Sequence, residues 1–197
     1  MERPESSAGR PSQQLRPIRL ETLPGCRLRI GRYPTFAYDA SGGGGDGWSD
    51  ADGNSLGFAA AGLVIPPLNS RSTRFLGLPL PPGPEITIRA QHLQGSWEPA
   101  SGRVSLAFEA RFSFQLRFGG STLYTAPDLR IACELSSAEA AGRRHRAQGT
   151  ALRPGGEGVL VGVAAVAPSG DALLDRFLGL PDEALAVLHC RIHEVPA

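Results

Sequence analysis

Two histidines near the end of the chain, His189 and His193, have the H-x3-H spacing that chelates zinc when both lie on one face of a helix. The neighbouring Leu188 and Ile192 belong to an apolar alternation with period two, which predicts a strand instead. On a strand, residues four apart lie about 13 Å apart, too far to share a metal ion. We therefore predict no metal site here. His189 and Arg191 would project from one face about 6–7 Å apart, where they either bind an anion as a ligand or simply face solvent.

A glycine-rich segment over residues 39–55 carries four aspartates and no basic residue. Within it, the run at 50–54 (Asp-Ala-Asp-Gly-Asn) resembles the middle of a calcium loop. The loop frame fails, because Trp48 would occupy its first position and Ala59 the twelfth, where a glutamate is needed. We expect a flexible, solvated loop near the basic N-terminal region, with a weak divalent site as the alternative.

The three cysteines, Cys26, Cys133 and Cys190, are far apart and form no C-x-x-C pair. Each lies within an apolar alternation, as a small buried residue of a strand would. A catalytic thiol or a disulfide is the alternative.

All 20 basic residues other than histidine are arginines, and the net charge is +1. The lack of lysine excludes a Schiff-base or phosphate-loop lysine, and the near-neutral charge gives no reason to expect a nucleic-acid partner. A basic cluster at 143–146 is typical of a solvated hairpin, with a phosphate or partner contact as the alternative. No hydrolase, dinucleotide-binding or metalloprotease motif is present, so no catalytic residue and no cofactor is assigned. A catalytic triad or carboxylate pair assembled in space stays open.

Most of the chain follows a strand pattern. Alternation or apolar runs predict strands at 26–30, 56–65, 85–93, 129–135, 159–167 and 185–195. Every even position from Val104 to Phe118 is apolar, which predicts one long strand with its even side inward and a bulge at 109–111. A short amphipathic helix is expected at 171–178, and residues 1–14 read as a disordered leader.

A hexapeptide, Arg-Phe-Leu-Gly-Leu-Pro, occurs at 74–79 and again at 176–181. The flanking segments 62–92 and 164–194 share the order apolar strand, proline, capped helical turn, hexapeptide and strand. This fixed offset predicts a duplicated, pseudo-two-fold domain with both hexapeptide phenylalanines buried. Arg74 and Arg176 would be the polar groups of any ligand site between the two copies.

The hexapeptide, its proline-rich flanks and the long aromatic strand resemble a family of small soluble proteins from cyanobacteria. The resemblance covers roughly residues 56–195. It implies a cytoplasmic or thylakoid-proximal setting and carries no activity.

These patterns predict an all-β protein with one domain over 15–197, either a barrel or a two-layer sandwich, with two pseudo-symmetric halves that each hold one short helix. No apolar run is long enough for a transmembrane segment, and the first residues lack a secretory signal, so we expect a cytoplasmic protein. The leading functional hypothesis is a non-catalytic binding or assembly module with a protein partner. The alternatives are a carrier of an apolar small molecule or pigment, and a hydrolase or isomerase with its site in a barrel mouth.

Overall fold

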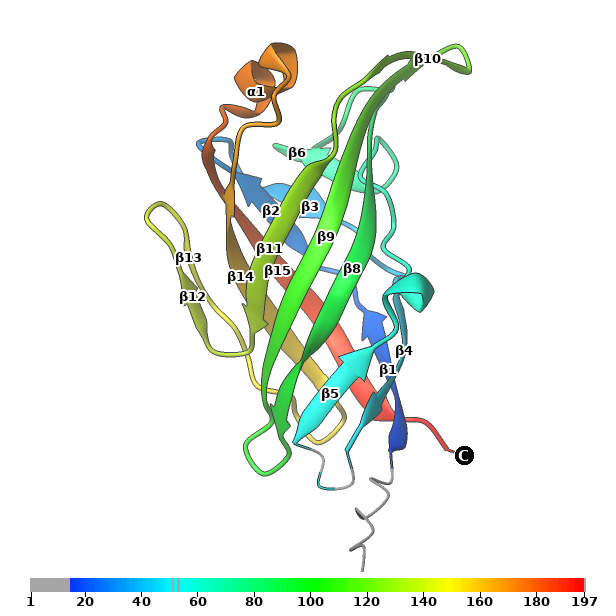
Figure 1. The fold of residues 1–197 in the computed structure, drawn as a ribbon, viewed down its shortest axis with the longest axis vertical. Helices are drawn as coiled ribbons and strands as arrows, with labels where there is room; N and C mark the ends of the chain where they lie inside the picture. Colours follow the sequence, from blue (N-terminus) through cyan, green and yellow to red (C-terminus); the bar gives the residue numbers. More distant parts are fainter. Residues whose placement is uncertain (1–14, 51, 53, 197) are drawn as a thin grey trace, which may run out of the picture.

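Antiparallel strand pairing runs through nearly the whole computed structural model, which describes residues 15–50, 52 and 54–196 (Figure 1). In chain order the elements are β1 (Arg16–Thr22), β2 (Arg27–Ile30), β3 (Phe36–Tyr38), β4 (Gly44–Ser49), β5 (Ser55–Phe58), the 3-10 helix η1 (Ala60–Gly62), β6 (Thr73–Phe75), β7 (Leu78–Pro79), β8 (Pro84–Glu98), β9 (Arg103–Phe118), β10 (Ser121–Thr125), β11 (Leu129–Ser136), β12 (Glu139–Ala141), β13 (Arg146–Gln148), β14 (Glu157–Val166), α1 (Ala172–Leu178) and β15 (Asp182–Glu194). The expected all-β class is confirmed.

The main sheet closes on itself into a ring. Its hydrogen-bonded order is β1-β4-β5-β8-β9-β11-β14-β15, and β15 pairs back with β1. Strand β15 has two partners on this side. Its C-terminal part, from Cys190 onward, pairs with β1, whereas its N-terminal part pairs with β2. From β2 the sheet continues through β3 and β6 to β7. Two isolated bridges, Gly44 to Val64 and Leu68 to Ile86, join the segment that leads into β6 to strands β4 and β8 of the ring. The hairpin of β12 and β13 lies outside the ring, against β14 and β15 (Figure 1).

The longest strand, β9, follows its sequence pattern over its first half. Val104, Leu106 and Ala110 are buried, whereas residues 107 and 109 are exposed. The even side chains open progressively after that, and Phe118 at the tip is exposed. The irregularity predicted at 109–111 occurs at that level but in the neighbouring strand, because β8 shifts register between Ala90 and His92 opposite Ala110.

The glycine-rich segment is not the flexible loop that its composition predicted. Residues 44–49 form strand β4, which is inserted between β1 and β5. Glycine is needed for this close packing, because a Cβ on Gly57 would lie 2.4 Å from the Trp48 ring and one on Gly47 would lie 2.4 Å from the carbonyl oxygen of Gly57. The expected closeness to the basic N-terminal region is confirmed by an ion pair of 2.7 Å between Arg19 and Asp46.

The expected helix in each half is wrong for the first half. Among the described residues there is one α-helix, α1, together with the single-turn η1. The segment after Asn69 forms side-chain-capped turns and then the hairpin of β6 and β7, because Thr73 and Phe75 pair with β3. The strand predicted at 56–65 is also shorter than expected and ends at Phe58.

Candidate functional site

The ring of strands encloses a cavity of about 200 Å3. Its lining is aliphatic or aromatic apart from a few groups such as Thr22, Tyr38 and Arg29. The hydroxyl of Thr22 donates to the carbonyl of Ala40, and that of Tyr38 donates to the carbonyl of Pro66. The exposed Arg29 directs its Nε to a backbone carbonyl on the surface. Because these polar groups are engaged by the backbone, the interior offers a ligand apolar burial rather than hydrogen bonds.

The cavity exists because large and small side chains face it from different strands. Strand β9 contributes the aromatic rings of Phe108, Phe112 and Phe114. Strands β14 and β15, which lie beyond β11, contribute larger residues such as Leu160 and Leu188 but also four small ones: Gly162, Ala164, Ala184 and Ala186. The register places these small residues side by side, because residue 162 pairs with 186 and residue 164 with 184. Such a wall leaves space that the aromatic rings do not fill.

One end of the ring is solidly packed. Ile18, Leu160 and Ile192 are at most 1% exposed and belong to one cluster with Leu56 and Val104. Dense packing of this kind leaves no voids large enough for a ligand. The cavity therefore lies in the middle of the ring and toward its other end.

Helix α1 packs over part of that other end. Asp171 caps the helix by accepting hydrogen bonds of 2.9 Å from the backbone N–H groups of Leu173 and Leu174. These bonds hold the pKa of the Asp171 carboxyl below its usual value. Leu174 and Leu178, four residues apart and so on one helix face, are buried, and Leu178 lines the cavity. The helix therefore covers part of the apolar interior.

The segment around α1 also gathers aromatic side chains from both hexapeptides. The Tyr33 ring centre lies 6.5 Å from that of Phe75 and 6.4 Å from that of Phe177. Phe177 in turn lies 6.0 Å from Phe114 of the cavity wall. The two hexapeptides, far apart in sequence, therefore meet at the same end of the ring.

The two hexapeptides do not occupy equivalent elements. The first forms the hairpin of β6 and β7, whereas the second ends α1. Gly77 and Gly179 both have the expected positive φ, at 82° and 72°. Phe75 is only half-buried and Phe177 is 53% exposed, so the predicted burial of both rings is wrong. Two-fold equivalence of the halves is not confirmed.

The four predicted ligand-binding residues separate into two places. Arg74 on β6 and Arg176 on α1 are both exposed at the covered end, and Arg176 lines a surface groove with Arg32 and Arg144. His189 and Arg191 lie on the outer side of β15, away from the cavity. Arg191 is paired with Glu157 and Glu21, and His189 lies against Gly25.

The cysteines are free thiols whose surroundings disfavour the thiolate. Burial raises the pKa of Cys190 to about 12 and that of Cys133 to about 11. Burial also raises the pKa of Cys26. A thiol with a raised pKa is a poor nucleophile at neutral pH, which agrees with the interpretation of all three as small apolar residues. Across the described residues, no group of three His, Cys, Asp or Glu side chains is placed to hold a metal ion.

A buried carboxylate that the sequence did not reveal holds the outer hairpin to the ring. Glu183 on β15 accepts hydrogen bonds from the backbone N–H groups of Arg143 and Arg144, at 2.7 and 2.8 Å. These bonds hold the pKa of Glu183 below its usual value. The predicted hairpin at the basic cluster is confirmed, and Arg146 pairs across it with Glu139 at 2.9 Å. The basic cluster therefore stabilises the hairpin and its attachment to β15.

No family model, no curated protein and no solved structure matches this chain. In the described part of the chain no helix has the length and apolar character needed to cross a membrane. The geometry of the cavity is therefore the evidence for the candidate site.

Proposed function

We propose that the protein is a non-catalytic carrier that holds one small apolar molecule inside its ring of strands, which acts as a closed barrel. The observation that carries this proposal is the apolar cavity between the phenylalanines of β9 and the small residues of β14 and β15. A packed core of this composition would be expected to fill such a space, since voids of this size cost stability.

The size of the cavity sets the class of ligand. A cavity of about 150 Å3 lined by Leu, Ile and Phe in another protein stays dry and binds benzene. The cavity here is somewhat larger, at about 200 Å3, yet below the usual range for drug-sized ligands. A compound with one or two small rings, or the end of an acyl chain, fits these dimensions. A whole linear pigment would have to leave most of its length outside.

The chemistry of the lining favours a carrier over an enzyme. Hydrolysis or isomerisation needs an acid, a base or a nucleophile within hydrogen-bonding reach of the substrate. The hydroxyls of Thr22 and Tyr38 are bonded to carbonyls, burial raises the pKa of Tyr38, and Cys133 is a thiol with a raised pKa. None of these groups is prepared for acid–base or nucleophilic work.

The test is a titration with 1-aminonaphthalene, a small two-ring apolar dye whose fluorescence emission shifts to shorter wavelength in apolar surroundings. We expect one dye per chain, displaced competitively by decanol. The matched variants are Ala186→Leu, which narrows the cavity, and Ala165→Leu, which makes the same change at an exposed outward position of β14. The proposal predicts loss of dye binding in the first variant and unchanged binding in the second. Equal binding by both variants, or none by the wild type, would contradict it.

A further inference from the structure

The end of the molecule that α1 covers carries most of the exposed apolar side chains. Of the eight large apolar side chains that are more than half exposed in the described residues, six lie on three segments at this end. We call these six the apolar rim: Leu76, Leu78, Phe118, Leu123, Leu173 and Phe177. Exposed apolar side chains gathered at one end of a molecule make that end a candidate interaction site.

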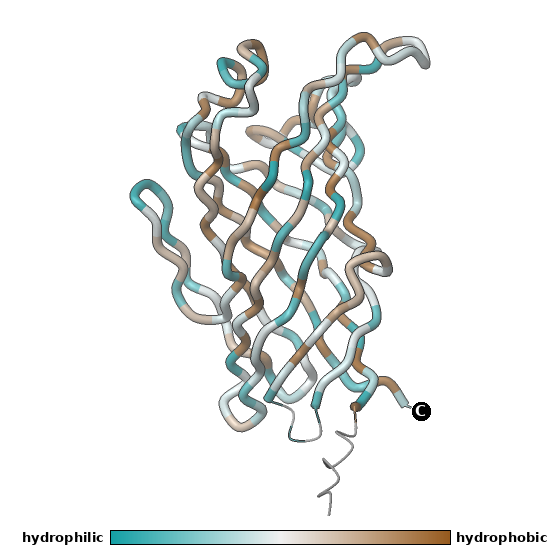
Figure 2. The backbone as a smooth tube through the Cα atoms, in the orientation of Figure 1, coloured by the Kyte–Doolittle hydropathy of each residue, from teal (hydrophilic) through white to brown (hydrophobic). Residues whose placement is uncertain are grey.

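The three segments lie at one end of the molecule although they are distant in sequence. They are the hairpin of β6 and β7, the hairpin of β9 and β10, and α1, all at the same end of the ribbon (Figure 1). The hydropathy tube shows apolar stretches reaching the tips of this end (Figure 2). Phe177 contacts Tyr33, which lies between β2 and β3 and also contacts Phe75 of β6, and it contacts Phe114 of β9 in the cavity wall.

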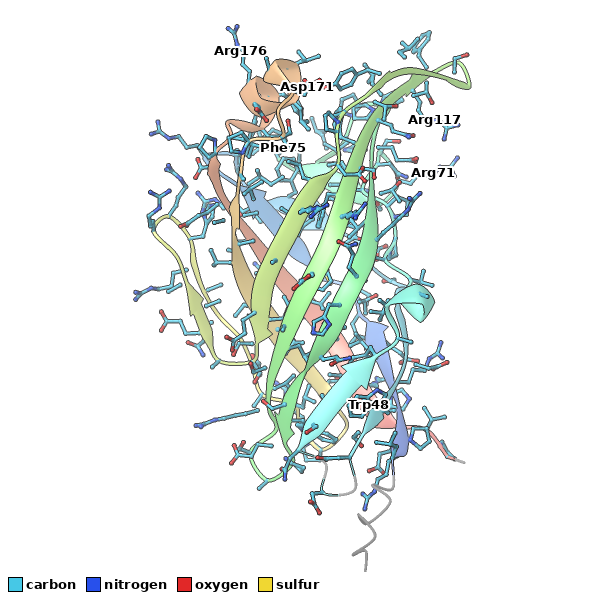
Figure 3. The ribbon with its side chains drawn as sticks, viewed as in Figure 1. Trp48, Arg71, Phe75, Arg117, Asp171 and Arg176 are labelled. Atoms are coloured by element: carbon cyan, nitrogen blue, oxygen red, sulfur yellow. The ribbon has the colours of Figure 1, made fainter. Side chains whose placement is uncertain are left out.

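Arginines accompany the rim. Arg71, Arg74 and Arg176 are exposed and, within the described ranges, none of them has a carboxylate partner. Figure 3 shows Arg71, Arg117 and Arg176 at the same end as Phe75, with Trp48 toward the other end. The open groove of about 480 Å3 beside Phe177 is lined by Arg32 and Arg176 and by Arg144, which is paired there with Asp182 at 2.7 Å.

The carboxylates at this end are already engaged. Asp171 caps α1, Asp175 accepts from Ser169, and Asp128 accepts from the Ser113 hydroxyl. Glu85 is bonded to Asn69 and lies 3.8 Å from Arg117. The free hydrogen-bond donors facing solvent are therefore guanidinium groups, whose planar forks suit phosphate oxygens.

We propose that this end docks on an anionic lipid surface, with the apolar rim at the depth of the headgroups and Arg32, Arg74 and Arg176 on the lipid phosphates. Interfacial binding of this kind combines apolar insertion with attraction between basic side chains and anionic lipids. The rim side chains stand on three separate tips, which suits insertion into a soft interface better than a flat protein face. The purpose of docking rests on the proposed carrier function, because an apolar cargo would pass between bilayer and cavity without crossing water.

The experiment is co-flotation of the full chain, without added ligand, with vesicles of phosphatidylcholine alone or mixed with phosphatidylglycerol. We expect binding to the mixed vesicles that weakens as salt is raised. The double variant Leu123→Ser and Leu173→Ser should bind on the order of tenfold more weakly, since two exposed apolar contacts are lost. The matched control Leu15→Ser, at an exposed position before β1 and outside the rim, should bind as the wild type does.

The charge arm uses Arg32→Gln combined with Arg176→Gln, which should remove the preference for phosphatidylglycerol. All these positions are exposed, so unchanged thermal unfolding and unchanged 1-aminonaphthalene binding without vesicles will show that each variant is folded with its cavity intact. That dye binding also separates failure of the docking proposal from failure of the carrier proposal. Absence of wild-type flotation, an unaffected rim variant, or rim-dependent self-association without vesicle binding would overturn the docking proposal.

Discussion

Replacing Ala186 by leucine tests whether the interior of the ring is really unfilled. Ala186 lies on β15, where it pairs with Gly162 on one side and Leu28 on the other, and all three line the cavity. Its methyl group is half-buried. A larger side chain at this position would project into the space in front of the β9 phenylalanines.

The expected magnitude follows from the three carbon atoms that leucine adds. Each buried carbon contributes about 0.8 kcal/mol, so full burial stabilises the fold by about 2.4 kcal/mol. Fixing the leucine rotamer costs about 0.5–1 kcal/mol. The free energy of unfolding should therefore rise by about 1–2 kcal/mol. In a core that is already filled, the same substitution would overpack it and cost about 1–3 kcal/mol. The sign of the change separates the two descriptions.

Urea denaturation followed by circular dichroism measures this change. Ala165→Leu is the control, because residue 165 is exposed on the outward side of the adjoining strand and should change stability by less than about 0.5 kcal/mol. The same leucine at 186 should abolish 1-aminonaphthalene binding. A variant destabilised by more than 1 kcal/mol, or one that is stabilised yet still binds the dye fully, would refute the reasoning.

Four further predictions concern stability and reactivity. In urea denaturation, Phe112→Ala should lower the free energy of unfolding by less than about 2 kcal/mol, because the ring is half-buried beside the cavity. Ile18→Ala, in the packed end, should lower it by about 2–5 kcal/mol. The reverse order would contradict this account. The pKa of Glu183 in the folded protein is lowered from 4.5, so its ionised carboxylate stabilises the fold above that pH. This stabilisation is lost as pH falls through the folded pKa. Glu183→Gln should lack this part of the acid sensitivity, which unfolding measured across pH 3–6 will show. The three cysteines, including the fully buried Cys190, should react with a charged disulfide reagent only after unfolding, and rapid reaction of the native protein would show an accessible thiolate. Gly179→Ala should cost about 1 kcal/mol in thermal unfolding from backbone strain alone, since φ is 72° and no atom lies within 4 Å of the new Cβ; no loss would count against the left-handed cap.

The local periodicity of the sequence was enough to predict the strand-rich class and the short helix. The even-numbered apolar pattern of β9 and the capped segment at 171–178 both form as expected, because each burial pattern matches one backbone geometry. The glycine-rich strand β4 was missed, because glycine content usually signals a turn. Here Gly57 is required by the approach of Trp48 across the strand pair, which is a tertiary contact.

The candidate site was not predicted, for a related reason. In the sequence, the four small residues of this wall look like ordinary members of apolar strands: Gly162, Ala164, Ala184 and Ala186. Their importance depends on the register that places them side by side on β14 and β15. The hexapeptide misled in the opposite direction, since identical residues fold as a hairpin at 74–79 and as a helix end at 176–181. Pairing of Phe75 with Phe36 in β3 decides the first case, and no periodicity within the hexapeptide contains that information.

The most direct test of the carrier function is to identify what the protein holds. The chain and its Ala186→Leu and Ala165→Leu variants would be purified in the same way from the cells that naturally make it, extracted with organic solvent and analysed by gas chromatography with mass spectrometry. The account predicts one small apolar compound, near one molecule per chain, in the wild type and in Ala165→Leu, and its loss from Ala186→Leu. Extracts from all three proteins that contain no such compound, or the same amount of it, would contradict the account.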